Sequence, residues 1–353
     1  MLFFGKKKKK KEKSSIGGFF RNKLFGDTDF SEAGTILKQK ISEGVKNVAS
    51  SREKLKDLPG TNYELGIHHM QAGNFFDAIF RFKMVCRFAP DNIDAYYNLG
   101  RCYMFRGENE EAKKTLEHVL EKDSKHFEAK YLLKKIDAPE KLDSIPESII
   151  KETVDIRAGF YEQDFIENGY MGSKSLVNMA FKDIDAKNPN YDVLDLGCGT
   201  GACGHVLKKR FLARTVTGVD LSGEMLKLCS KLAIENERVY DNLHEAEISR
   251  YLKSEKSKYD MILSDLAMDF IGKLDDYVLS VKNALKEGGW YATVVRFEDD
   301  LEKGYKLNLE FEDFSYSRKY FVDSFQKAGF KLSSSKEIDM VGDEKVEMLI
   351  FKS

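Results

Sequence analysis

The stretch YDVLDLGCGTGACG, residues 191–204, decides the fold. Its first six residues form a short apolar run that predicts a strand, and the glycines Gly197, Gly199 and Gly201 follow at once. Apolar residues then recur at helical spacing through Val206, Leu207 and Phe211. A strand that enters a helix through a glycine-rich turn predicts the first βα unit of a parallel sheet, with the turn at the carboxyl end of the strand.

Further βα units are predicted downstream. The expected strands are 215–219, 259–264 and 290–295, followed by a terminal hairpin of 330–338 and 346–351. Asp220 and Asp265 end the first two of these strands, and helical stretches separate the strands. We therefore expect an α/β fold, a doubly wound, Rossmann-like sheet with a reversed last strand and ligands at the carboxyl ends of its strands.

The glycine-rich turn also fits the dinucleotide fingerprint G-x-G-x-x-G at Gly199, Gly201 and Gly204, which is a weak signal by itself. Asp195 lies two positions before the first glycine, however, and the glycines begin at Gly197. This arrangement resembles the first motif of class I S-adenosylmethionine-dependent methyltransferases. The alternative is a tight strand-to-helix turn that binds no cofactor.

The resemblance implies a site for S-adenosylmethionine. The family places an acid at the end of the second strand to accept both ribose hydroxyls, and Asp220 stands there with two acceptor oxygens. Glu247 occupies the position of the usual adenine contact, where aspartate is commoner, and Met225 is placed for packing against adenine or in the helical core. The implied cofactor-binding residues are Asp195, Gly197, Gly199, Gly201, Asp220, Leu221, Met225, Glu247, Ile248 and Asp265.

Four residues are candidates for facing the methyl acceptor. Asp269, four residues beyond Asp265, is the preferred pocket acid, and Tyr161 and Tyr170 belong to an aromatic-rich entry segment. Residues 314–317 resemble an element of the bacterial tetratricopeptide-containing methyltransferases that carries a histidine where this chain has Tyr316. The resemblance therefore implies that another group must replace any catalytic histidine. An amine acceptor must be neutral when it attacks, and an oxygen acceptor needs a base. For each of the four candidate residues, the alternative to a role at the acceptor is ordinary packing or exposure to solvent.

Residues 61–136 contain a repeat with a period of 34, the tetratricopeptide signature. Six positions coincide, namely Tyr63 with Tyr97, Leu65 with Leu99, Gly66 with Gly100, Gly73 with Gly107, Ala78 with Ala112, and Phe82 with Leu116. The first helix of a third, incomplete repeat follows and ends near Ile136, where it caps the array. Repeats before such a domain resemble bacterial tetratricopeptide-containing methyltransferases. The repeats bind a peptide or protein partner, or they serve an intramolecular or dimerisation role.

The charge is uneven along the 353 residues. Residues 1–60 hold 15 lysines and arginines against 7 acids, including the run from Lys6 to Lys11, so the rest of the chain is acidic. The run is a solvated tail, or it attaches weakly to nucleic acid or to anionic lipid at the inner face of a membrane. An acidic folded body argues against a nucleic-acid substrate. The five cysteines show no metal-ligand spacing.

The expected organisation is a basic tail with an amphipathic helix over residues 1–60, repeats over 61–136, a linker over 137–149 and the methyltransferase domain over 150–353. We expect a cytoplasmic enzyme without a metal that transfers a methyl group from S-adenosylmethionine to an N or O nucleophile of a small molecule. The alternatives are a protein or peptide methyltransferase whose substrate is recruited by the repeats, and a non-catalytic adaptor that only binds the cofactor.

Overall fold

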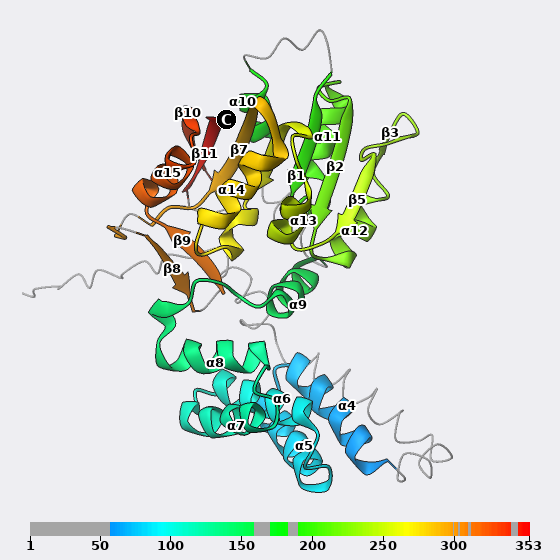
Figure 1. The fold of residues 1–353 in the computed structure, drawn as a ribbon. Helices are drawn as coiled ribbons and strands as arrows, with labels where there is room; N and C mark the ends of the chain where they lie inside the picture. Colours follow the sequence, from blue (N-terminus) through cyan, green and yellow to red (C-terminus); the bar gives the residue numbers. More distant parts are fainter. Residues whose placement is uncertain are drawn as a thin grey trace, which may run out of the picture. The chain divides into compact units, whose positions relative to one another are not determined.

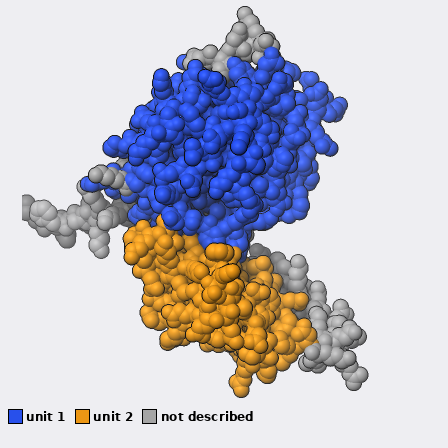
Figure 2. Space-filling view, in the orientation of Figure 1, with its two compact units in different colours: residues 1–19, 143–353 blue, residues 20–142 orange. Residues whose placement is uncertain are grey.

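The computed structural model describes residues 57–158, 170–182, 190–298, 300–302, 304–309, 312–339 and 345–353. The lysine run, the amphipathic helix expected near residues 31–55 and Tyr161 lie outside the described residues. The described residues divide into two compact units between Leu142 and Asp143 (Figure 2). We call them the helical unit and the sheet unit and describe each by itself.

The helical unit consists of consecutive helices joined by short turns (Figure 1). Its helices are α4 (Leu58–Gln71), α5 (Phe75–Phe88), α6 (Ile93–Phe105), α7 (Asn109–Lys122) and α8 (Phe127–Asp137), followed by the short helix η1 (Pro139–Lys141). Gly73 and Gly107 adopt φ values of 72° and 75° in the turns within the two repeats, a conformation that favours glycine. The predicted helical repeat domain is confirmed.

Close helix packing explains why two of the repeated positions are glycine. A Cβ atom on Gly66 would lie 2.7 Å from the ring of Phe82, and one on Gly100 would lie 2.8 Å from the side chain of Leu116. Phe82 and Leu116 are fully buried, so neither side chain has room to withdraw. The sequence matches therefore record one packing contact made twice, once in each repeat.

The sheet unit is built on a seven-stranded sheet with the order β10-β11-β7-β6-β1-β2-β5 (Figure 1). The strands are β1 (Asp192–Leu196), β2 (Thr215–Asp220), β5 (Asn242–Glu245), β6 (Tyr259–Asp265), β7 (Leu285–Val295), β10 (Lys331–Asp339) and β11 (Lys345–Lys352). The first five are parallel, whereas β11 runs antiparallel to both β7 and β10. The predicted doubly wound sheet with a reversed last strand is confirmed.

The helices of the sheet unit pack against one another as well as against the sheet. Their bounds are α9 (Glu147–Ala158), α10 (Gly172–Ala180), α11 (Ala202–Lys209), α12 (Gly223–Cys229), α13 (Ile248–Ser254), η3 (Ala267–Phe270), α14 (Asp275–Ala284) and α15 (Arg318–Lys327). Helix α10 packs against α11, whereas α13 contacts α14 and α14 contacts α15. No helix in the described part of the chain is long and apolar enough to span a membrane.

The structure differs from the sequence prediction at the start of β7 and in two small hairpins. Strand β7 begins at Leu285 and runs through the predicted Gly288-Gly289 turn, with Gly288 at φ 71° and a register shift against β6. The unpredicted hairpins pair β3 (Ala233–Ile234) with β4 (Glu237–Arg238), and β8 (Tyr305–Asn308) with β9 (Asp313–Tyr316). Strands of two to four residues carry little periodic signal.

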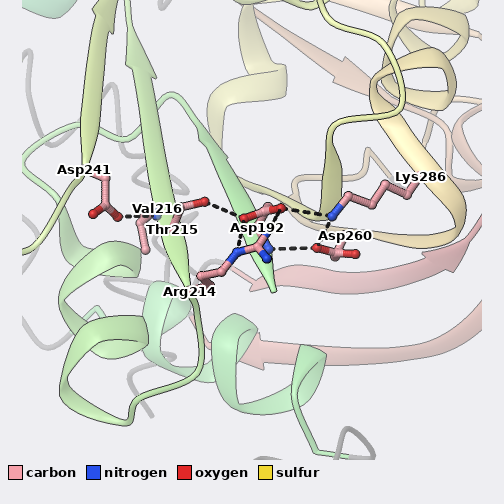
Figure 3. A network of polar contacts seen from close by, with 7 residues as sticks. All are labelled: Asp192, Arg214, Thr215, Val216, Asp241, Asp260 and Lys286. Atoms are coloured by element: carbon pink, nitrogen blue, oxygen red, sulfur yellow. Dashed lines mark hydrogen bonds and ion pairs between the residues drawn. The ribbon is translucent and has the colours of Figure 1, made fainter. Parts of the chain in front are cut away.

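A polar network joins the amino ends of the strands, opposite the edge where the glycine-rich turn lies (Figure 3). Lys286 Nζ lies 2.9 Å from Asp192 Oδ2 and 2.7 Å from Asp260 Oδ2, while Arg214 and Thr215 also donate to Asp192. Partial burial opposes ionisation of Asp192, but these donors outweigh it and lower the pKa of Asp192 to about 2. The network ties four strands together where they begin.

Candidate active site

A cleft opens at the carboxyl ends of β1, β2 and β6, the edge where parallel α/β sheets bind ligands. The loop after β1 lines it with Gly197 and Gly199, whereas the predicted Gly201 is not a lining residue; the three glycines have φ values of 66°, 52° and 98°. Residues other than glycine rarely adopt this backbone conformation, so the loop requires glycine at these positions. The lining residues are Ile150, Val154, Gly197, Gly199, Asp220, Leu221, Met225, Glu247, Ile248, Asp265, Leu266, Ala267, Asp269, Phe270, Ile271, Arg296 and Asp313.

Asp220 ends β2 and is fixed by backbone amides. Its Oδ2 accepts from Gly199 N at 2.8 Å, and its Oδ1 accepts from Ser222 N at 2.8 Å. Burial raises the pKa of Asp220, and the hydrogen bonds from Ser222 and Gly199 act in the opposite direction. A carboxylate oxygen has a second lone-pair site, so Asp220 retains acceptor capacity toward the cleft.

Asp195 lies beneath the loop and does not line the cleft. It is 1% exposed, and its Oδ2 accepts from the Tyr240 hydroxyl at 2.6 Å. Burial raises the pKa of Asp195 to about 7 despite this hydrogen bond, with Asp265 and Asp220 adding to the rise. The same Tyr240 hydroxyl accepts from Gly204 N at 3.1 Å, so it links β1 to the start of α11. The geometry gives Asp195 a structural position under the glycines rather than direct access to a ligand.

The ring of Tyr240 occupies the space that side chains on the neighbouring glycines would need. A Cβ atom would lie 2.3 Å from Tyr240 Cζ at Gly204, 2.8 Å from Cδ1 at Gly218 and 3.1 Å from Cε2 at Gly201. The third glycine of the apparent dinucleotide fingerprint is thus explained by a buried tyrosine of the chain itself. Tyr240 is a site-forming residue that the sequence analysis passed over.

Asp265 lines the cleft at the end of β6 and is held by two hydroxyls. Its Oδ1 accepts from Tyr170 at 2.5 Å and its Oδ2 accepts from Ser173 at 2.5 Å. Burial raises the pKa of Asp265, and the two hydrogen bonds oppose that rise. Tyr170, a candidate for contacting the acceptor, instead ties the segment before α10 to β6. Ser173 was not singled out in the sequence.

Glu247 lines the cleft, but its carboxylate also caps helix α13. Its two oxygens accept from Ser249 N at 2.8 Å and Arg250 N at 2.7 Å. These hydrogen bonds fix the side chain at the start of the helix. Helix capping alone therefore explains why the residue is acidic, whether or not it contacts a ligand. Leu221, Met225 and Ile248 line the same part of the cleft, as the family resemblance implies.

Of the residues predicted to face the methyl acceptor, Asp269 lines the cleft and Tyr316 does not. Asp269 lies in η3, is 7% exposed and lines the cleft. Tyr316 is 0% exposed and does not line the cleft; its hydroxyl lies 2.6 Å from the Met268 carbonyl and also donates toward the Ile271 carbonyl. Tyr316 therefore holds the turn on both sides of Asp269 rather than facing an acceptor.

Two charged lining residues, Arg296 and Asp313, were missed by sequence reasoning. Arg296, just beyond β7, has Nη1 at 3.3 Å and Nη2 at 3.8 Å from the carboxylates of Asp313 and Asp269, respectively. Asp269, Arg296 and Asp313 come from η3, the end of β7 and β9, so no local sequence motif predicts that they lie together. Within the described residues, no cluster of histidine, cysteine and acidic side chains is arranged to hold a metal ion.

Comparisons with known proteins match both units. Residues 187–318 match a methyltransferase domain family and residues 69–136 match a tetratricopeptide repeat family. Malonyl-[acyl-carrier protein] O-methyltransferase of Priestia megaterium is 29% identical over 120 residues, 33% of this chain and 41% of the relative. Ribosomal protein L11 methyltransferase of Thermosipho melanesiensis is 38% identical over 82 residues, 23% of this chain and 30% of the relative.

Among solved structures, the magnesium protoporphyrin IX methyltransferase of Synechocystis with bound S-adenosylmethionine aligns with 58% of this chain and 96% of its own, at 11% identity and a TM-score of 0.45. The chain matches less than half the length of both curated relatives.

Residues 187–318 thus match a methyltransferase domain family, and the strand order of the sheet is the one that the sequence resemblance to class I methyltransferases implies. The chain joins tetratricopeptide repeats to this domain.

Proposed function

We propose that the sheet unit binds S-adenosylmethionine in the cleft and transfers its methyl group to an N or O nucleophile of a small molecule. The observation that carries this proposal is the pairing of Asp220 with the glycine loop. The backbone fixes both carboxylate oxygens, and the left-handed glycines beside them leave a surface without side chains. These residues fit a ligand that offers two hydroxyls and needs close backbone approach.

Different residues of the cleft bind different parts of S-adenosylmethionine. Asp220 accepts hydrogen bonds from the ribose, while Leu221, Met225 and Ile248 provide apolar surface for the adenine, beside Glu247. Gly197 and Gly199 allow the backbone to approach the methionine part. Tyr240 and Asp195 support the loop from beneath. When bound, S-adenosylmethionine supplies an activated methyl group, so the protein's main tasks are orientation and exclusion of water.

Calorimetric titration with S-adenosylmethionine tests the proposal. We expect binding by wild type and a loss of at least tenfold in affinity for Asp220→Asn, because a charged acceptor becomes a poorer one. Asp241→Asn is a matched control, since the Asp241 carboxylate also accepts from a backbone amide, Val216 N at 2.7 Å, but at the amino end of β2. No binding by wild type, or equal losses in both variants, would contradict the assignment.

A protein or peptide acceptor is the second candidate, and the tetratricopeptide repeats favour it because such repeats commonly bind proteins. The relatives' names give malonyl-[acyl-carrier protein] and ribosomal protein L11 as their substrates. Transfer of a labelled methyl group into cell-extract fractions separates the candidates. Label in small metabolites supports the first candidate, label in protein supports the second, and no label in either favours a non-catalytic adaptor.

A further inference from the structure

The cleft is strongly acidic among the residues that the structure describes. Its lining contains five carboxylates and one cationic side chain, Arg296. Asp220, Glu247 and Asp265 belong to the part assigned above to the methyl donor. The other charged residues, Asp269, Arg296 and Asp313, form what we call the acid–arginine group. This group bears on the methyl acceptor, and the inference below rests on the proposed function.

The acid–arginine group carries a net charge of −1 and is well shielded from solvent. The side chains of Asp269, Arg296 and Asp313 are 10%, 19% and 8% exposed. An arginine that offered its terminal nitrogens to the cleft would be a typical binding group for a carboxylate. Here both terminal nitrogens face carboxylates of the protein itself. An anionic acceptor would meet two negative groups beside one positive group, and limited solvent access strengthens that repulsion.

The turn that carries Asp269 is held in place by a dedicated contact. The buried Tyr316 hydroxyl contacts the carbonyl of Met268, before Asp269, and that of Ile271, after it. The same turn places the apolar side chains of Phe270 and Ile271 in the cleft lining. One element therefore presents a carboxylate and an apolar surface side by side, in a position fixed by a side chain from β9.

We propose that the acceptor is a primary or secondary amine on an apolar skeleton. Asp269 and Asp313 attract and orient its ammonium group, and Phe270 and Ile271 contact its apolar part. Before transfer, the ammonium gives one proton to the Asp269 carboxylate. The freed nitrogen lone pair forms the new N–C bond while the C–S bond to the methyl group breaks, and that electron pair stays on sulfur. The products are a methylated ammonium and S-adenosylhomocysteine.

The test compares two probes that differ only in their charged end. The full chain is saturated with S-adenosylhomocysteine and titrated calorimetrically with tryptamine and with indole-3-propionate, which share an indole and a two-carbon linker. We expect tryptamine to bind at least tenfold more tightly than the carboxylate, as a charge-assisted contact warrants. Equal or tighter binding of the carboxylate, or no binding of either probe, would overturn the amine assignment.

Two variants locate the effect. Asp269→Asn and Asp313→Asn should each weaken tryptamine binding several-fold while the dissociation constant of S-adenosylhomocysteine stays unchanged, which also reports that the domain is folded. Asp275→Asn is the control, because the Asp275 side chain is 62% exposed and outside the cleft lining. Unchanged tryptamine binding in both cleft variants would contradict the proposal. Failure of wild type to bind S-adenosylhomocysteine would instead refute the donor site.

Discussion

Replacing Tyr240 by phenylalanine removes a single buried oxygen atom from beneath the glycine loop. The ring remains and continues to fill the space beside Gly204. Two hydrogen bonds disappear, the one that Tyr240 donates to Asp195 at 2.6 Å and the one that it accepts from Gly204 N at 3.1 Å. The variant therefore measures what the polar support of the loop contributes, without a cavity of any size.

The expected cost depends on pH because Asp195 titrates. A hydrogen bond to a charged group contributes about 1.5–3 kcal/mol and one between neutral groups about 1 kcal/mol, so Tyr240→Phe should cost about 2–4 kcal/mol at pH 8. The pKa of Asp195 is about 7, raised chiefly by burial. At pH 5.5 Asp195 is mostly protonated and the charge-assisted part vanishes, which leaves about 1–2 kcal/mol.

Urea unfolding followed by Trp290 fluorescence provides the assay. Trp290 is the chain's single tryptophan and lies on β7, so its signal reports on the sheet unit. Tyr251→Phe is the control: its hydroxyl lies 2.9 Å from that of Tyr259 and away from Asp195, so its cost should be the same at both pH values. A cost of Tyr240→Phe below about 0.5 kcal/mol at pH 8, or one that does not change with pH, would refute the reasoning.

Three further changes have defined outcomes. Because the pKa of Asp195 in the folded state is raised to about 7, its protonation stabilises the native state at low pH, and this contribution is lost as pH rises toward 7. Asp195→Asn should therefore reduce the pH dependence of the free energy of unfolding, measured by urea titration between pH 4 and 8. The folded pKa of Asp192 is lowered to about 2, so its contribution is present above pH 4 and lost as pH falls toward 2. Asp192→Asn should cost about 1–2 kcal/mol at pH 7, since the partner Arg214 is largely exposed, and almost nothing near pH 2. Gly204→Ala places a Cβ atom 2.3 Å from Tyr240 Cζ, and it should cost about 1–3 kcal/mol and weaken binding of S-adenosylhomocysteine in calorimetry.

The sequence predicted the parts of the site that lie on one continuous βα unit or at strand ends. Gly197, Gly199 and Asp220 could be placed because hydrophobic runs mark the strands, and the residues just after parallel strands meet at one edge. The tetratricopeptide helices could be placed because the packing of Gly66 on Phe82 recurs at Gly100 and Leu116. Both signals are local or periodic, so they are visible without the fold.

The remaining parts depend on contacts between distant segments. Tyr240 lies 45 positions after Asp195, in a polar stretch, and only the folded sheet brings its hydroxyl beneath the loop. Arg296 and Asp313 are adjacent because the β8–β9 hairpin returns to the end of β7, and no propensity of the short strands announced that hairpin. The burial that makes Asp195 structural and turns Tyr316 away from the cleft is likewise a tertiary property.

The most direct measurement for the central claim is an experimental structure of the chain with S-adenosylhomocysteine. The account predicts that the ligand lies in the cleft against Gly197 and Gly199, with both ribose hydroxyls within hydrogen-bond distance of the Asp220 carboxylate. Ligand bound at another edge of the sheet, or in the cleft with its ribose away from Asp220, would contradict the account.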